Sequence, residues 1–128
     1  MAWRIVNARF LDRQISDFSR KAEYYASPSM SFEQCETFVK DFEAFQKIRA
    51  AVDELRRGNP SDPTSKLKYF STDDDNNSYY ALVCGRWVAY YLVNLPAKTA
   101  VALFFVHKEA LAADILDLLR KAMGPDGP

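Results

Sequence analysis

The chain has 128 residues, of which 48% are hydrophobic and 14% are aromatic, and it carries 17 basic and 17 acidic residues. This length suits one domain, and this apolar content is enough to bury a core, which excludes a wholly disordered chain. The formal net charge of zero argues against a nucleic-acid coat that binds by electrostatic attraction alone.

The two cysteines and the N-terminal stretch indicate the cellular compartment that we expect for the protein. Cys35 and Cys84 lie far apart in the sequence and lack the spacing of metal ligands, so we expect them to be reduced packing residues. The first ten residues, MAWRIVNARF, lack the apolar region of a signal peptide. No window approaches the roughly 18 apolar residues that a membrane span needs. We therefore expect a cytoplasmic protein that does not act in a membrane.

The N-terminal third predicts a strand followed by a helix. The stretch WRIVNARFL, residues 3–11, has a period near two at Trp3, Ile5 and Asn7, which favours a strand. The following apolar residues recur at steps of four and three and form one face of an amphipathic helix: Leu11, Ile15, Phe18, Ala22 and Tyr25. Pro28 predicts that this helix ends before it.

A second helix begins with the clearest local signal in the chain. The motif SFEQ fits a capping box, in which Ser31 and Gln34 exchange hydrogen bonds between side chains and backbone. Apolar residues then recur every three or four positions up to Leu55. Arg56 and Arg57 suit the negative end of the helix, and Gly58 suits a left-handed cap. The two helices predict a helical hairpin.

The second half predicts an antiparallel run of strands. GNPSDPTS indicates a loop, KLKYF a short strand and STDDDNN a polar turn. Residues 78–84 alternate, with Tyr79, Ala81 and Val83 on one face, and Gly85 sits where the chain can reverse into a strand over residues 86–94. TAVALFFVH is apolar at nearly every position, as in a central strand covered on both faces.

The chain closes with a helix and a short tail. KEALAADILDLLRKAM predicts a helix whose buried side holds four residues: Leu111, Ile115, Leu118 and Leu119. The predicted fold is α+β, with an N-terminal strand, a helical hairpin on one face of an antiparallel sheet of about four strands, and a C-terminal helix. Residues 1–123 would form one domain and residues 124–128 a flexible tail.

Few motifs in the chain indicate a catalytic, metal-binding or nucleotide-binding site. Asp73, Asp74 and Asp75 lack the alternating spacing of a calcium loop, so they predict a solvated turn. The chain has four glycines and no glycine-rich phosphate loop, so we expect no nucleotide cofactor. We also expect no metal, because a lone histidine and two cysteines without ligand spacing cannot make a zinc site. His107 is the only histidine and is tied to no nucleophile by a motif, so by pattern alone it is a polar strand end.

A set of basic residues near the strands is the candidate site. If they gather on one sheet surface, they could stabilise the charge on a phosphate during metal-free RNA cleavage. The set comprises Lys66, Lys68, Arg86, His107 and Lys108, and the tyrosines placed to stack bases are Tyr69, Tyr80 and Tyr90. In the alternative interpretation, the basic residues rim the sheet for solubility and the tyrosines fill half-buried strand faces.

The order of these elements resembles the RelE/ParE superfamily of toxins from type II toxin–antitoxin systems. The resemblance covers roughly residues 2–123 and rests on the helical hairpin, the lysine-bearing strand KLKYF, YYALVCGRWVAYYLV and TAVALFFVHKEA. It implies a small toxin neutralised by a cognate antitoxin. RelE-like members cut mRNA, usually on the ribosome, whereas ParE-like members inhibit DNA gyrase.

The resemblance also implies roles for single residues. Lys66 and Lys68 match the lysines of the lysine-bearing strand, Arg86 lies near the family's strand arginine with Tyr90 near its tyrosine, and His107 and Lys108 match the closing basic pair. In an endoribonuclease the 2′-hydroxyl of RNA would attack the adjacent phosphate. The cations would stabilise charge and His107 would transfer protons.

A non-enzymatic function on the same scaffold remains open. The neutral charge and the aromatic-rich sheet face favour an inhibitor of gyrase type or an interaction protein that acts by protein contact. A third alternative is an orphan globular protein whose resemblance to the superfamily is coincidental.

Overall fold

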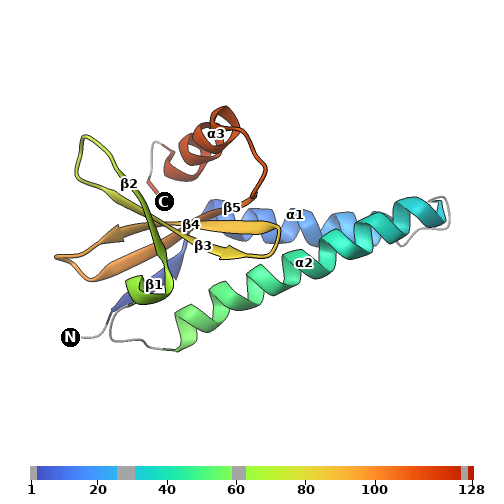
Figure 1. Cartoon of the computed structure of the whole chain (residues 1–128), viewed down its shortest axis with the longest axis horizontal. Coiled ribbons are helices and arrows are strands. Elements are labelled where there is room, and N and C mark those ends of the chain that lie inside the picture. Colours follow the sequence, from blue (N-terminus) through green and yellow to red (C-terminus); the bar gives the residue numbers. More distant parts are fainter. Residues whose placement is uncertain (1–2, 26–30, 59–62, 125–126) are drawn as a thin grey trace.

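The computed structural model describes residues 3–25, 31–58, 63–124 and 127–128. Its strands form one five-stranded sheet with helices on both faces (Figure 1). The strands are β1 (Arg4–Asn7), β2 (Lys68–Thr72), β3 (Ser78–Cys84), β4 (Trp87–Asn94) and β5 (Thr99–His107). The helices are α1 (Arg9–Tyr25), α2 (Phe32–Arg57), the short 3₁₀ helix η1 (Pro63–Lys66) and α3 (Ala112–Met123). The predicted α+β class is confirmed.

The sheet has the order β1-β5-β4-β3-β2. β2 pairs with β3, β3 with β4 and β4 with β5, and all three pairings are antiparallel, as predicted. The first strand adds a fifth, which runs parallel to β5 with Arg4 opposite Thr99, so the sheet is mixed. The long connection through helices allows this parallel pairing, and the ladder continues where the Ala8 N–H donates to the Ala102 carbonyl (2.8 Å).

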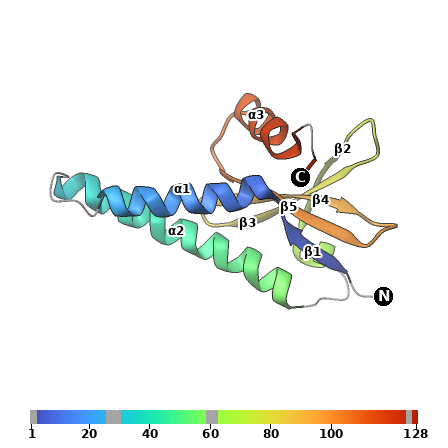
Figure 2. The ribbon, with the colours of Figure 1, turned by 180° about the vertical axis from the view of Figure 1, so that it is seen from behind.

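The sheet separates two hydrophobic layers. The helical hairpin covers one face, where Phe45 and Ile48 of α2 pack with Tyr91 and Phe105. Helix α3 packs on the opposite face, over Leu103 and other residues of β5. Figures 1 and 2 show α1 and α2 side by side on one face and α3 on the other. β5 lies between β1 and β4 and is buried along most of its length, which confirms the predicted central strand.

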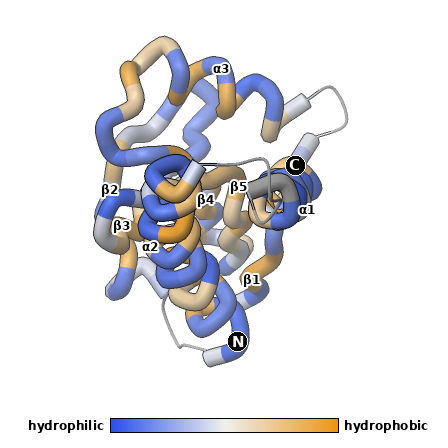
Figure 3. Tube along the Cα trace, turned by 90° about the vertical axis from the view of Figure 1, so that its right-hand side faces the viewer, coloured by the Kyte–Doolittle hydropathy of each residue, from blue (hydrophilic) through white to orange (hydrophobic). Residues whose placement is uncertain are grey.

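The helical hairpin extends past the sheet. The buried residues of α2 all lie in its C-terminal half: Phe45, Ile48, Val52 and Leu55. Its N-terminal half projects beyond the strands (Figure 1), and Phe32 there is 81% exposed. In Figure 3 the outer turns of α2 are largely hydrophilic and stand in front of mainly hydrophobic strands. Phe18 of α1 stacks on Phe45, with ring centroids 4.2 Å apart, and so ties the two helices together.

The ends of α2 test two sequence predictions. The capping box is confirmed, because the Gln34 N–H donates to Ser31 Oγ (3.2 Å) and the Ser31 N–H donates to Gln34 Oε1 (3.0 Å). The prediction of a left-handed cap at Gly58 was wrong. Gly58 has a φ of −68° and donates its N–H to the Glu54 carbonyl (2.8 Å), so the helical turn simply continues through it.

Helix α3 starts later than predicted. Leu111 was assigned to its buried side, but it is 71% exposed. The reason is that Leu111 is the N-cap residue, with an extended backbone (φ −72°, ψ 155°) that turns its side chain off the helical face. Ile115, Leu118 and Leu119 pack against the core as predicted.

The predicted break after the first helix and part of the predicted C-terminal tail lie outside the described residues. The break after the first helix lies at residues 26–30, and the tail includes residues 125–126. Part of the predicted loop GNPSDPTS is the helix η1. None of the helices described is both long enough and apolar enough to cross a membrane.

Candidate functional site

Three of the predicted site residues meet where β4 begins and β5 ends. Gly85 takes a positive φ of 60° in the turn between β3 and β4. The Lys108 N–H then donates to the Arg86 carbonyl (2.9 Å), and Trp87 pairs with His107 across the two strands. Arg86, His107 and Lys108 therefore form one group, which we call the β4–β5 corner.

The imidazole of His107 has a defined setting within the β4–β5 corner. Its ring lies edge-on to Trp87, with centroids 5.8 Å apart, on the face that carries the helical hairpin. The Glu109 N–H donates to His107 Nδ1 (3.3 Å), so in the neutral ring the proton is on Nε2. His107 is half-buried, and Nε2 is the atom left to exchange a proton.

Arg86 is exposed and faces α2. It lines two shallow hollows, one with Glu33 and Asp41 and the other with Lys40 and Lys47. Arg86 makes no ion pair with any described residue. The charges around it are mixed in sign, so the β4–β5 corner is not a strongly positive surface.

Lys66 and Lys68 are not part of the β4–β5 corner. Lys66 ends η1, and Lys68 begins β2 at the outer edge of the sheet, where it pairs with Ala81. Ala81, the partner of Lys68, lies three residues along β3 from Cys84, which pairs with Trp87 at the start of β4. Together with the two strand spacings between β2 and β4, this places the backbone of Lys68 roughly 14 Å from that of Trp87. The predicted cationic set is therefore split between two places.

The three predicted tyrosines are also on different faces. Tyr69 and Tyr80 contact each other edge-on, with centroids 5.5 Å apart, and Tyr80 packs against the core on the hairpin side. Tyr90 lies on the opposite face between Phe70 and Phe104. Burial raises the pKa of Tyr90. These rings do not form one stacking platform.

An apolar hollow lies between α3 and the sheet, and we call it the α3 hollow. It has a volume of about 220 Å³. Its lining residues are Phe70, Ser71, Asp73, Tyr79, Tyr90, Phe104, Ile115, Leu116 and Leu119, of which Asp73 is the charged one. At its rim Phe70 is 55% exposed and Leu116 is 51% exposed. Val83, 57% exposed, lies on the same face of β3. The surface suits contact with apolar groups.

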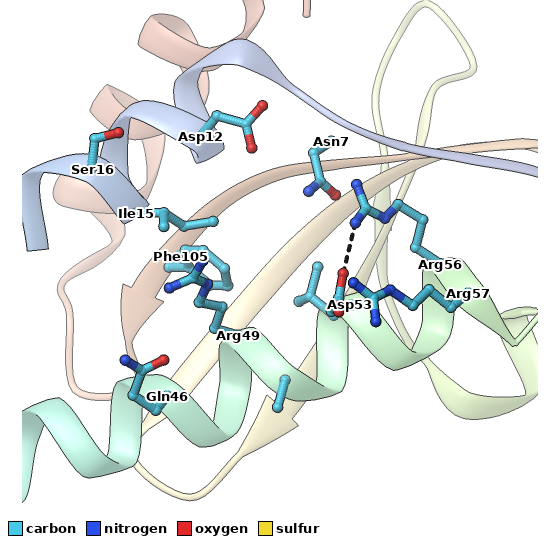
Figure 4. Close-up of a pocket in the computed structure, with 12 residues that line it drawn as sticks. Asn7, Asp12, Ile15, Ser16, Gln46, Arg49, Asp53, Arg56, Arg57 and Phe105 are labelled. Carbon is cyan, nitrogen blue, oxygen red and sulfur yellow. Dashed lines mark hydrogen bonds and ion pairs between the residues drawn. The ribbon is translucent and has the colours of Figure 1, made fainter. Parts of the chain in front are cut away.

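A larger groove lies between α1 and α2, with a volume of about 560 Å³, and we call it the interhelical groove (Figure 4). Its polar lining residues are Asn7, Asp12, Ser16, Gln46, Arg49, Asp53, Arg56 and Arg57. Sequence reasoning missed this site. The available signal is the spacing of Arg49, Arg56 and Arg57 near one side of α2, but the pattern of Arg56 and Arg57 alone indicates only charges that suit the helix end.

No protein-family model matches the chain, and no curated protein matches it. Within the described ranges, no three His, Cys, Asp or Glu side chains gather as metal ligands.

Proposed function

We propose that the chain is the toxin of a toxin–antitoxin pair, as its resemblance to the RelE/ParE superfamily implies, and that it acts by binding a target protein. One observation supports this mode of action. The sheet face opposite the helical hairpin offers an apolar hollow with exposed apolar residues around it, whereas the basic residues suited to RNA cleavage are dispersed.

RNA cleavage requires cations and proton-transfer groups around a single phosphate. Lys66 and Lys68 lie at the β2 edge, away from Arg86 and His107. Tyr90 faces the other side of the sheet from His107. This dispersal favours a function that does not depend on one concerted cationic site.

The α3 hollow has the chemistry of a protein-binding surface. It is lined mainly by aromatic and aliphatic side chains, and its rim residues Phe70 and Leu116 are half exposed. Aromatic residues are common anchors of protein interfaces. A volume of about 220 Å³ suits the insertion of one or two apolar side chains from a partner. In this proposal the target uses this surface, and the antitoxin segment neutralises the toxin by covering it.

Growth after tightly induced expression in bacteria tests the proposal. We expect the wild type to arrest growth and Leu116→Glu to relieve the arrest, because a carboxylate at the rim of the α3 hollow must be desolvated on binding. Leu95→Glu is the matched control, since Leu95 is similarly exposed (49%) but lies in the turn after β4, outside the lining of the α3 hollow. Folded wild-type protein that leaves growth unchanged, or a toxic Leu116→Glu variant, would overturn the proposal.

The β4–β5 corner supports a second candidate, a metal-free endoribonuclease. Arg86, His107 and Lys108 are close together through the 2.9 Å backbone hydrogen bond. In such a reaction the RNA 2′-oxygen would bond to phosphorus, the bond from phosphorus to the 5′-oxygen would break, and His107 would move a proton. The products would be a 2′,3′-cyclic phosphate and a 5′-hydroxyl. Relief of arrest by His107→Ala and Lys108→Ala, with Leu116→Glu still toxic, would favour this candidate.

A further inference from the structure

The strand wall of the α3 hollow is built by an irregularity in β2. The register of β2 shifts between Tyr69 and Ser71, so Phe70 is an extra residue that opposes no residue of β3. Successive residues of a strand normally point to opposite faces, but Phe70 and Ser71 both line the α3 hollow. A bulge of this kind disrupts the backbone ladder of an edge strand, which discourages the addition of another strand. A partner is therefore recognised here through its side chains.

The connection between β2 and β3 gives this recognition a charge. It contains Asp73, Asp74 and Asp75, which we call the acidic turn. Asp73 lines the α3 hollow, and its carboxylate already accepts four hydrogen bonds. Asp74 and Asp75 are exposed and make no ion pair with any residue that the structure describes. Two carboxylates without a counter-ion in the described chain therefore stand one and two residues from the lining of the α3 hollow.

The charge of the acidic turn reaches the wall of the α3 hollow. Tyr79 is a lining residue, and its pKa is raised to about 12. Burial is the largest cause, followed by the hydrogen bond to Asp73 and by the negative charges of Asp73 and Asp75. The strand wall therefore presents a negative potential to a group that enters the hollow.

The helical wall of the α3 hollow does not offset this charge. Helix α3 carries two acidic and two basic residues, so its side chains sum to zero charge. One residue of each sign is already paired, because Lys121 Nζ lies 3.0 Å from Asp117 Oδ2. The exposed Leu116 stands on this neutral wall. The hollow is thus apolar inside, neutral on its helical side and negative on its strand side.

We infer that the segment of the target protein that enters the α3 hollow carries a basic side chain next to its apolar anchor. The anchor would lie between Phe70 and Leu116, and the lysine or arginine would pair with Asp74 and Asp75. This inference rests on the proposed function and names the chemistry of the partner that it requires. An exposed ion pair adds little affinity, but like charges brought together at an interface are strongly unfavourable. The acidic turn would therefore select basic segments among those that offer an apolar anchor.

The dose of protein that arrests growth tests the inference. The double variant Asp74→Lys with Asp75→Lys reverses the charge where we expect the partner's cation. The inducer concentration that halves the growth rate should rise by roughly tenfold or more over that of the wild type, because like charges would then meet at the interface. Neither aspartate side chain accepts a hydrogen bond within the described residues, so we expect the melting temperature of the purified variant to match that of the wild type.

A second double variant controls for overall charge. Glu43→Lys with Glu54→Lys makes the same change in net charge at two exposed residues of α2, the helix that packs on the other face of the sheet (Figure 1). This variant should arrest growth at the wild-type dose. If it relieves the arrest as strongly as the reversed acidic turn does, overall charge is the cause and the inference is overturned.

The Leu116→Glu variant separates this inference from the proposed function. If Leu116→Glu relieves the arrest but the reversed acidic turn is toxic at the wild-type dose, the inference is overturned while the proposed function stands. If Leu116→Glu is still toxic, or the wild type leaves growth unchanged, the proposed function fails and the inference fails with it.

Discussion

Tyr91 illustrates how one residue can be enclosed by the core and still lack a polar partner. It is the largest of the fully buried side chains, and it lies on the hairpin face of β4. Its hydroxyl is buried without a hydrogen-bond partner among the described residues, and burial raises its pKa. By contrast, the hydroxyl of Tyr79 donates to Asp73 Oδ2 (2.8 Å). The ring of Tyr91 therefore contributes packing, while its hydroxyl contributes a desolvation cost.

We predict that Tyr91→Phe leaves the free energy of unfolding unchanged or raises it by about 1 kcal/mol, because the substitution removes an unpaired polar atom and keeps the ring. Tyr79→Phe is the matched control and should lower it, since it breaks the hydrogen bond to Asp73. Urea unfolding of the purified variants measures both. A clear loss of stability in Tyr91→Phe would show that its hydroxyl has a partner and would contradict this account of the core.

At the scale of elements, the turn between β2 and β3 is organised by one carboxylate. Asp73 accepts from the backbone N–H groups of Asp75 (2.9 Å) and Asn77 (3.0 Å), from Asn77 Nδ2 (3.2 Å) and from the Tyr79 hydroxyl. The hydrogen bond from Tyr79 lowers the pKa of Asp73, and the Asn77 and Asp75 donors lower it further. Burial and the nearby Asp73 raise the pKa of Tyr79 to about 12. The ionised form of Asp73 thus stabilises this turn.

The lowered pKa of Asp73 fixes the direction of a pH dependence. Its folded-state pKa lies below the ordinary value of 3.8, so the stability that it contributes is present above that value and is lost as pH falls through the folded-state pKa. We expect wild type to unfold at higher urea than Asp73→Asn at neutral pH, with the difference shrinking in acid below 3.8. Asp74→Asn is the control and should show no such convergence. A wild-type advantage that persisted unchanged in strong acid would contradict this role.

Elements fixed by local sequence were predictable, and elements fixed by distant contacts were not. The capping box at Ser31 and the reversal at Gly85 depend on residues a few positions apart, and both are present. The parallel pairing of β1 with β5 joins Arg4 to Thr99, which no local pattern encodes. The predictions of a left-handed cap at Gly58 and of a buried side chain at Leu111 were wrong. The residue types permit a cap or a buried face at these positions but do not require it.

The same distinction applies to the candidate sites. His107 and Lys108 meet Arg86 because antiparallel neighbours carry them to one end of the sheet, a consequence of strand order that the sequence could suggest. The position of Lys68 depends on how β2 pairs at the outer edge, including its irregular register after Tyr69. The interhelical groove depends on how α1 and α2 pack, so the spacing of the α2 arginines alone could not join them to the α1 residues across the groove.

At the scale of the whole molecule, the sheet divides two surfaces of different chemistry. The hairpin side carries the interhelical groove, which is lined mainly by polar and charged side chains. The α3 side carries the α3 hollow, whose apolar lining suits a protein partner. The β4–β5 corner lies at one end of the sheet, beside α2. The proposed function assigns inhibition to the α3 side.

The integrity of mRNA in cells arrested by the wild-type protein tests the central claim most directly. If the protein acts by contact through the α3 hollow, growth should stop while transcripts keep their full length, and Leu116→Glu should restore growth. Transcripts cut to fragments with 5′-hydroxyl ends, in a pattern abolished by His107→Ala, would contradict the account and assign the activity to the β4–β5 corner.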